Sequence, residues 1–207
     1  LARALHNVQV NNTAKAGAQK TECRYCEAKE KPQQGTHESL FCARPGLDVW
    51  KASAWAESKD YYNPKEVMEA ARLMLSVADR YKGNNNFEYD LVDVLRQAIT
   101  EKGRLVLKVV SAAYKAEDQD LFAQASQRFL NLILLQDELL GTRKEFRVGN
   151  WTGMARNIGQ TKEEKDLYEW NARVQITTWG NHSASERGKL HDYAHKEWNG
   201  ILKDFYY

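Results

Sequence analysis

The 207-residue sequence contains three prolines, and none of them follows Pro64. Proline breaks the interior of a helix and is rarely found in central strands. Its absence from residue 65 to Tyr207, together with sustained helical spacing of apolar residues, predicts an all-α region. We expect an antiparallel bundle of about six helices, because the connections between the expected helices are short. The predicted helices are 64–81, 88–116, 119–140, 150–158, 161–178 and 189–205.

The chain also lacks long apolar runs and a strong charge of either sign. No run approaches the roughly 20 apolar residues that cross a bilayer. The longest, Leu130–Leu135, is interrupted by Asn131 and is predicted to be buried in the core. The formal net charge is +2, with lysines and arginines interspersed among acids, so no electrostatic footprint for nucleic acid stands out. We therefore expect neither a membrane nor a nucleic-acid partner.

The N-terminal residues 1–35 differ in character from the rest of the chain. The stretch 11–35 is polar and contains Gly17, Pro32 and Gly35, which is typical of an irregular arm. Alternatively, residues 1–35 end a preceding domain. The chain starts at Leu1 without a signal-peptide pattern, so we expect it to be a piece of a longer polypeptide. Its localisation therefore cannot be determined from its first residues.

Cysteine is scarce, with three residues in the chain. Cys23 and Cys26 have the two-residue gap of a zinc or redox pair, and Cys42 and His37 complete four candidate ligands. The spacing between the two halves fits no common zinc module. The alternatives are a Cys23–Cys26 disulfide, a pairing with Cys42, or thiols in a surface loop.

Two histidines also have metal-binding spacing. His191 and His195 lie four residues apart in a predicted helix, as in H-E-x-x-H zinc enzymes. The glutamate that serves as general base in those enzymes is missing, and no third ligand is evident. We therefore expect no metal and no other cofactor.

The segment Phe87–Gln97 concentrates acids, an arginine, an amide and aromatic rings at the expected start of a helix. The three asparagines before it can cap that helix, and acidic side chains are favoured in its first turns. Its apolar and polar side chains form two separate stripes: Leu91, Leu95 and Ala98 on one, Asp90, Asp93 and Gln97 on the other. A plain surface helix scatters its charges, so this helix start is a candidate site.

The residue pattern of this segment resembles that of a known protein family. Tyr89–Val94, followed by Arg96 and Gln97, closely resembles the segment that opens a long helix in the C-terminal domain of α-N-acetylglucosaminidases, glycoside hydrolase family 89. Further blocks agree in the expected order: Glu38–Leu47 and then Trp55 upstream; Asn171–Gly180, Asp192–Ala194 and Phe205–Tyr207 downstream. The resemblance implies that residues 36–207 are an α-helical C-terminal domain of such an enzyme. The arm before residue 36 lies outside it.

The resemblance also implies an activity for the full-length protein, which is a retaining hydrolysis of terminal α-linked N-acetylglucosamine from glycans. The catalytic residues would be two glutamates on a preceding barrel domain of the same polypeptide. This sequence has no alternation of strands and helices that would form such a barrel. Asp90 and Asp93 come from one turn of a helix and cannot readily flank a sugar, as the two carboxyl groups of a glycosidase must. We therefore expect no catalytic residue here and no activity from this chain alone. The resemblance further implies secretion or a periplasmic location in bacteria, and lysosomes in animals.

The helical domain is expected to form one wall of the active-site cleft and to bind substrate there. Trp55 is the first candidate, because an indole face stacks on a sugar while its N–H reaches an oxygen. Its alternative role is to pin its loop onto the bundle. Glu88, Tyr89 and Asp90 are the next candidates, because a helix N-terminus places them where sugar hydroxyls can be bound. Their alternative role is capping and domain contact.

A second group of residues is expected to be structural at the cleft: Arg44, Asp93, Arg96, Arg173 and Trp179. Arginines in apolar segments usually have carboxylate partners, and their planar fork can hold two segments together. We expect Asp90 or Asp93 to accept from Arg96 or Arg173. We expect the pair to be buried, so that removing the arginine would leave a buried charge unpaired and cost several kcal/mol.

Two rival functions use the same residues. A helical protein-interaction module would expose an apolar patch that a partner seals, without measurable sugar affinity. An independent carbohydrate-binding domain would bind sugar in isolation. The domain of a larger hydrolase should neither cleave nor bind sugar tightly alone.

Overall fold

The computed structural model describes residues 40–43, 45–49, 62–180 and 195–207. Every regular element in these ranges is a helix, which confirms the expected all-α fold. The principal helices are α2 (Pro64–Leu75), α3 (Asn85–Lys115), α4 (Gln119–Gly141), α5 (Val148–Ile158) and α6 (Lys162–Gln175). Short helical turns occur at η1 (Leu40–Cys42), η2 (Ala78–Tyr81), η3 (Lys144–Phe146) and η4 (Leu202–Tyr206). None of the helices described is long and apolar enough to cross a membrane.

Tertiary contacts divide the chain into two compact units, with the division inside α3 between Glu101 and Lys102. The described part of the first unit is residues 62–101. The described part of the second consists of 40–43 and 45–49, then 102–180 and 195–207.

In the first unit, α2 packs against the first half of α3. The Asn63 side chain accepts from the Lys65 amide at 3.0 Å, and Pro64 opens the helix, so both predicted start signals are present. The core holds Ala70, Ala71, Met74 and Val94, with Phe87, Leu91, Leu95 and Ala98 packed against it. The predicted apolar stripe of α3 therefore faces α2. The helix expected over 64–81 ends earlier, at Leu75, where the Ser76 hydroxyl donates to the Leu73 carbonyl.

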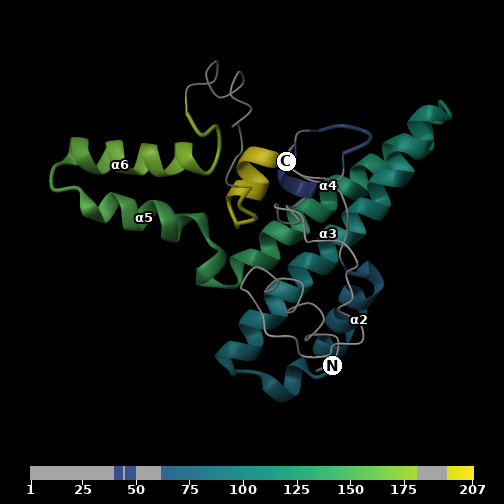
Figure 1. Cartoon of the computed structure of the whole chain (residues 1–207), viewed down its shortest axis with the longest axis horizontal. Coiled ribbons are helices and arrows are strands. Elements are labelled where there is room, and N and C mark those ends of the chain that lie inside the picture. Colours follow the sequence, from purple (N-terminus) through teal and green to yellow (C-terminus); the bar gives the residue numbers. More distant parts are fainter. Residues whose placement is uncertain (1–39, 44, 50–61, 181–194) are drawn as a thin grey trace, which may run out of the picture. The chain divides into compact units, whose positions relative to one another are not determined.

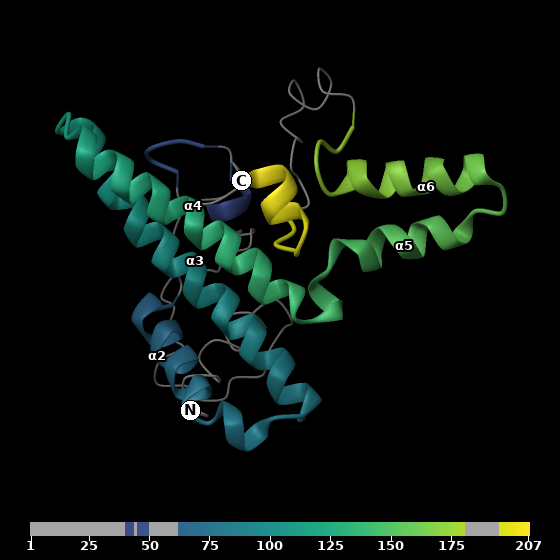
Figure 2. The same ribbon diagram turned by 180° about the vertical axis from the view of Figure 1, so that it is seen from behind.

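In the second unit, the second half of α3 and α4 run antiparallel, side by side in both ribbon views (Figures 1 and 2). The Asp118 carboxylate caps α4 by accepting from the Leu121 amide at 2.9 Å. Phe41 of η1 lies over Gly103 of α3 and meets the Phe129 ring of α4 edge-on, at 5.5 Å between centroids. A Cβ at Gly103 would lie 2.6 Å from the Phe41 ring, so the absence of a side chain permits this packing.

The C-terminal residues 195–207 lie along α4, and their backbone corrects one prediction. The helix expected over 189–205 is absent from residues 195–200, and residues 189–194 lie outside the described ranges. In its place Asn199 donates to the Phe146 carbonyl at 2.8 Å and accepts from the Val148 amide at 3.1 Å. Gly200 has a φ of +93°, a left-handed conformation that favours glycine. Helical structure begins only at Ile201, because nonlocal partners satisfy the backbone before it.

Helices α5 and α6 form an antiparallel hairpin that extends away from α4 within the second unit (Figures 1 and 2). The capping box predicted at Thr161 is present: Thr161 accepts from the Glu164 amide, and Glu164 accepts from the Thr161 amide. Between the helices, the Trp151 indole donates to the Ala172 carbonyl at 3.0 Å. The hairpin is therefore held by local capping and by this interhelical contact.

Candidate functional site

The N-terminal turn of α3 is built by side chains that satisfy its unpaired amides. Asn84 accepts from the Phe87 amide at 3.0 Å, so the helix starts at Asn85 rather than at the predicted residue 88. Glu88 accepts from the Gly83 amide at 2.8 Å. Gly83 has a φ of +83°, which turns the chain back toward the carboxylate. Glu88 therefore has the capping role that the sequence offered as its alternative.

Tyr89 and Asp90 follow directly in the same turn, and both side chains are exposed. An aromatic pair lies beside this turn, since the Tyr81 ring stacks on Phe87 at 4.9 Å between centroids. The Arg80 guanidinium lies over the Tyr81 ring, 5.8 Å from its centre. The helix start thus exposes a phenol and a carboxylate, those of Tyr89 and Asp90, to solvent.

Asp93 and Arg96 form an ion pair one turn further along α3. This confirms that an arginine pairs with one of the two aspartates. The expectation that the pair is buried is wrong, because the two side chains retain 38% and 30% of their accessible surface. Such a pair contributes little stability, since water screens it.

A hydrogen-bonded cluster continues the polar stripe of α3 into the interior of the first unit. The Gln97 amide donates to the Tyr62 hydroxyl and to the Glu101 carboxylate, both at 2.7 Å. Tyr62 in turn donates to Glu101, whose residue is only 2% exposed. Gln97 was predicted from the sequence as part of the polar stripe, whereas Tyr62 and Glu101 were not predicted. The available signal was the recurrence of polar residues at 90, 93, 97 and 101, a helical spacing.

Of the remaining predicted site residues, two lie in the second unit and two lie outside the described residues. Arg173 pairs with Glu169 on its own helix at 2.7 Å, not with Asp90 or Asp93. Trp179 is partly exposed, and its backbone amide closes the end of α6 by donating to Val174 at 2.7 Å. Trp55 and Arg44 lie outside the described residues.

The possible metal ligands receive no support from the described part of the chain. No group of three or more histidine, cysteine, aspartate or glutamate side chains there could hold an ion. Cys42 is buried in η1 and His195 lies in the C-terminal segment. Cys23, Cys26, His37 and His191 lie outside the described residues.

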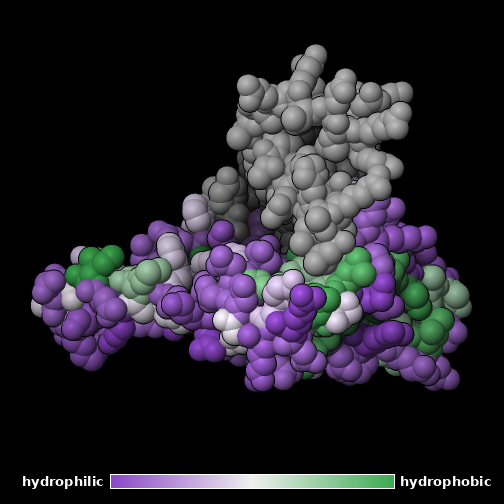
Figure 3. Space-filling model, turned by 90° about the horizontal axis from the view of Figure 1, so that it is seen from below, coloured by the Kyte–Doolittle hydropathy of each residue, from purple (hydrophilic) through white to green (hydrophobic). Residues whose placement is uncertain are grey.

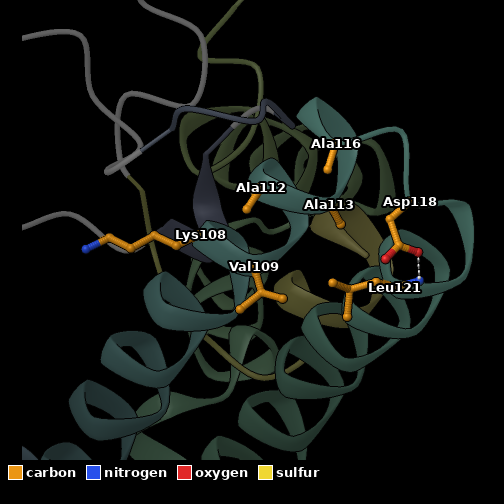
Figure 4. Close-up of a pocket in the computed structure, with 7 residues that line it drawn as sticks. All are labelled: Lys108, Val109, Ala112, Ala113, Ala116, Asp118 and Leu121. Carbon is orange, nitrogen blue, oxygen red and sulfur yellow. Dashed lines mark hydrogen bonds between the residues drawn. The ribbon is translucent and has the colours of Figure 1, made fainter.

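A shallow groove of about 360 Å³ lies between the second half of α3 and the start of α4 (Figure 4). Its lining is mainly apolar and consists of Lys108, Val109, Ala112, Ala113, Ala116, Asp118 and Leu121. Its one carboxylate is that of Asp118, which is bonded to the Leu121 amide as a helix cap. The groove therefore offers apolar contact without a pair of carboxylates.

Three of the four carboxylates along α3 have local partners. Glu88 accepts from a backbone amide, Asp93 from Arg96, and Glu101 from Tyr62 and Gln97. Glycoside hydrolysis needs two carboxyl groups on either side of the scissile bond. These three carboxylates therefore act within the domain, in capping and in side-chain contacts.

Comparison with known proteins identifies the class and then the family. Residues 22–207 match the family described as Alpha-N-acetylglucosaminidase (NAGLU) C-terminal domain. The Alpha-N-acetylglucosaminidase of Homo sapiens is 32% identical over 174 residues, which are 84% of this chain and 22% of the human protein. The chain belongs to the α-N-acetylglucosaminidase C-terminal domain family, as the sequence motifs indicated. The match begins at residue 22, before the boundary predicted at residue 36.

Solved structures of family 89 glycoside hydrolases from Clostridium perfringens are similar to this chain. One, in complex with PUGNAc, has a TM-score of 0.82 at 32% identity and covers 98% of this chain and 22% of its own. Another, in complex with its substrate GlcNAc-alpha-1,4-galactose, has a TM-score of 0.80 at 36% identity, covering 84% of this chain and 20% of its own. The chain thus spans about a fifth of the length of these relatives.

Proposed function

We propose that this chain is the C-terminal domain of a retaining α-N-acetylglucosaminidase, which hydrolyses terminal α-linked N-acetylglucosamine from glycans. It forms one wall of the active-site cleft, and the catalytic glutamates lie on a barrel domain that precedes it in the same polypeptide. The observation that carries this proposal is the family match over residues 22–207 in a chain that spans about a fifth of its relatives. Most of the enzyme's length, including its catalytic residues, then lies outside these residues.

The relatives support the substrate class and the two-glutamate mechanism. The Clostridium perfringens structure that holds GlcNAc-alpha-1,4-galactose is of a protein in which two glutamates are replaced by glutamine. Glutamine keeps the shape of glutamate but can serve neither as nucleophile nor as acid. In our chain, Glu88, Asp93 and Glu101 of α3 already have partners, and Asp90 by itself does not supply two carboxyl groups, which agrees with a catalytic pair located elsewhere.

The cleft wall is proposed at the start of α3, with Tyr89 and Asp90 as the sugar-binding groups. Both are exposed in the turn after the Glu88 cap, where the phenol can donate to or accept from sugar hydroxyls and the carboxylate can accept from them. Trp55 adds an aromatic face to the same wall in this proposal. Glu88 contributes indirectly, because its bond to Gly83 fixes the position of the turn.

The test is hydrolysis of a chromogenic α-N-acetylglucosaminide by this chain and by a polypeptide extended upstream through the barrel domain. Activity should occur only in the longer polypeptide. There, Trp55→Ala, Tyr89→Phe and Asp90→Asn should lower kcat/KM about 10-fold or more, as expected when a buried sugar hydroxyl loses its partner. Asp120→Asn, an exposed acid in the first turn of α4, is the matched control and should leave kcat/KM unchanged.

Turnover by the 207 residues alone would contradict the placement of the catalytic groups. Sugar affinity of this chain without hydrolysis by the longer one would favour a carbohydrate-binding domain. Absence of both would favour a protein-interaction module.

A further inference from the structure

The sequence contains one Asn–Gly pair, Asn199–Gly200, and this pair lies in the C-terminal segment that is bonded to α4. Asparagine is a thermolabile residue, and it is most reactive before glycine, which has no side chain to shield its backbone nitrogen. Gly200 has a φ of +93°, a conformation that favours glycine over every other residue. The turn therefore places a chemically labile pair at this position.

Deamidation of such a pair is an intramolecular acyl transfer. A base takes the proton of the Gly200 amide, and the nitrogen bonds to Cγ of Asn199. The Cγ–Nδ2 bond breaks, and Nδ2 gains a proton and leaves as ammonia, which produces a succinimide ring. Water then opens the ring at either carbonyl and gives aspartate or isoaspartate at position 199. These steps consume water and need no oxidant or other co-reactant.

Asp137 binds both reacting groups of the pair. Its Oδ1 accepts at 2.7 Å from the Gly200 amide, whose nitrogen is the attacking atom. Its Oδ2 accepts at 2.7 Å from Nδ2 of Asn199, which is the leaving group. The backbone carbonyl of Asp137 accepts from the same Nδ2 at 3.0 Å, so the side-chain amide makes two bonds to one residue.

The backbone of Asn199 is fixed as well. Its carbonyl accepts from the Val148 amide at 3.1 Å, and its amide donates to the Phe146 carbonyl at 2.8 Å. Cyclisation requires the Asn199 side chain to turn over the plane of the peptide that joins it to Gly200, and these bonds oppose that rotation. Asp137 is 6% exposed and the pair is half-buried, which limits the access of hydroxide and water.

We propose that Asn199–Gly200 is a deamidation site and that Asp137 holds it unreactive in the folded domain. The reaction then proceeds from the state in which the segment has opened, so its rate follows the open fraction. The inference depends on contacts within the second unit and not on the proposed function.

The product is expected to loosen residues 199–203 irreversibly, because ammonia has left. The new carboxylate would face Asp137 where Nδ2 now donates, and two like charges so close repel each other. Isoaspartate would also lengthen the backbone by one carbon and displace it from Val148. The exterior shown in Figure 3 is mainly hydrophilic, whereas Ile201 and Leu202 are 4% and 0% exposed. Their burial still anchors the segment, so the loosening should be local.

The experiment ages the full-length polypeptide at mildly alkaline pH and follows deamidation at position 199 by peptide mass spectrometry. The folded polypeptide should react about 10-fold or more slowly than the same polypeptide unfolded in guanidinium chloride. Asp137→Ala should raise the rate in the folded state about 10-fold or more. Gly103→Ala is the matched control, because its Cβ would strain the contact with Phe41 and leave Asp137 in place. Its rate should stay within about 2-fold of the unsubstituted polypeptide.

A second measurement tests the consequence of the reaction. Asn199→Asp reproduces the charge of the product, and Asn199→Ser is the uncharged counterpart. Hydrogen exchange at the Gly200 and Lys203 amides, which both donate to Asp137, should accelerate more in Asn199→Asp. Equal exchange in the two variants would overturn the inference that the product loosens this segment.

Equal deamidation rates in the folded and unfolded polypeptide would overturn the protective role, and this comparison needs no variant to fold. Equal acceleration by Asp137→Ala and Gly103→Ala would also overturn it, since general destabilisation would then be the cause. A faster reaction in the folded polypeptide would make Asp137 the base that promotes cyclisation, which contradicts protection. Protection in a polypeptide that fails to hydrolyse the α-N-acetylglucosaminide would leave the inference standing while the proposed function fails.

Discussion

The Asp137 carboxylate of α4 accepts a hydrogen bond from the Asn199 side chain at 2.7 Å, joining residues that are 62 positions apart. Its other oxygen accepts from the backbone amides of Gly200 at 2.7 Å and Lys203 at 3.2 Å. Next to it, Gln136 donates to Glu197 at 2.7 Å. These bonds replace the helix that periodicity predicts over 195–200, and they fix the C-terminal segment to α4.

Replacing Asp137 by alanine should release this segment. Asp137 is only 6% exposed, so the Gly200 and Lys203 amides lose their acceptor without gaining water. The Asn199 side chain keeps only its bond to the backbone carbonyl of residue 137. Each unsatisfied group costs about 1–3 kcal/mol, and partial relaxation should reduce the total loss to about 2–4 kcal/mol. Urea denaturation measures the loss, and hydrogen exchange at the Gly200 and Lys203 amides should accelerate.

Asp120→Ala is the control for this change, since Asp120 is an exposed acid on the same helix. Its effect on the unfolding free energy should stay within about 0.5 kcal/mol. Unchanged exchange at Gly200 and Lys203 in Asp137→Ala would show that the carboxylate does not hold the segment.

Replacing Gly103 by alanine should destabilise the second unit, although alanine is the better helix former. The new Cβ would lie 2.6 and 2.7 Å from two atoms of the buried Phe41 ring, which also packs on Phe129. Overpacking costs about 1–3 kcal/mol and outweighs the gain of about 1 kcal/mol in helix propensity. We expect a net loss of about 1–2 kcal/mol in thermal or urea unfolding.

Gly153→Ala in α5 is the matched substitution, because a Cβ there meets nothing within 4 Å. It should stabilise the protein by up to about 1 kcal/mol. Equal effects of the two substitutions would mean that Phe41 yields and that Gly103 is not required by packing.

Breaking the ion pair between Asp93 and Arg96 should have a small effect. Both side chains remain partly exposed, so Arg96→Gln should lower the unfolding free energy by less than about 1 kcal/mol. The loss should shrink further in 1 M salt, which screens the pair. A loss of several kcal/mol, independent of salt, would instead indicate a buried pair. Urea denaturation at low and high salt measures this loss of unfolding free energy.

Acid should weaken the α5–α6 hairpin. Hydrogen bonds from the Gln160 and Thr161 amides lower the pKa of Glu164 below its ordinary value of 4.5, and the bond from Lys162 lowers the pKa of Asp166 below 3.8. Because the folded values are depressed, their stabilisation is complete above those ordinary values. It is lost as pH falls through the lowered folded values. Unfolding followed between pH 6 and 2 should therefore show a decline that Glu164→Gln reduces. An identical pH profile in this variant would contradict the capping role.

Local signals predicted the starts of the helices well. Asn63 with Pro64, and Thr161 with Glu164, cap the helices that they were expected to cap. Helix caps can be predicted from sequence because the capping side chain accepts from a backbone amide three or fewer residues away. The start of α3 was predicted three residues late, because the first of the three asparagines, Asn84, is the cap.

Local sequence signals did not predict hydrogen bonds between residues that are distant in the chain. Tyr62 and Glu101 are 39 positions apart and meet through Gln97, so spacing along α3 indicates one side of this cluster but not the tyrosine. Arg173 had two aspartates as expected partners, yet Glu169 on the same helix is closer and takes the bond. Choosing between possible partners requires their positions in space.

The all-α fold, the helix caps and the family could be predicted from the sequence, because the absence of proline after Pro64, helical periodicity and short motifs are local properties of the chain. The contact of Phe41 with Gly103, the bonds of Asp137 to residues 199–203 and the exposure of apolar side chains in the hairpin could not. These features depend on surfaces brought together from distant parts of the chain. Buried groups there must be satisfied or packed, whatever their local preference.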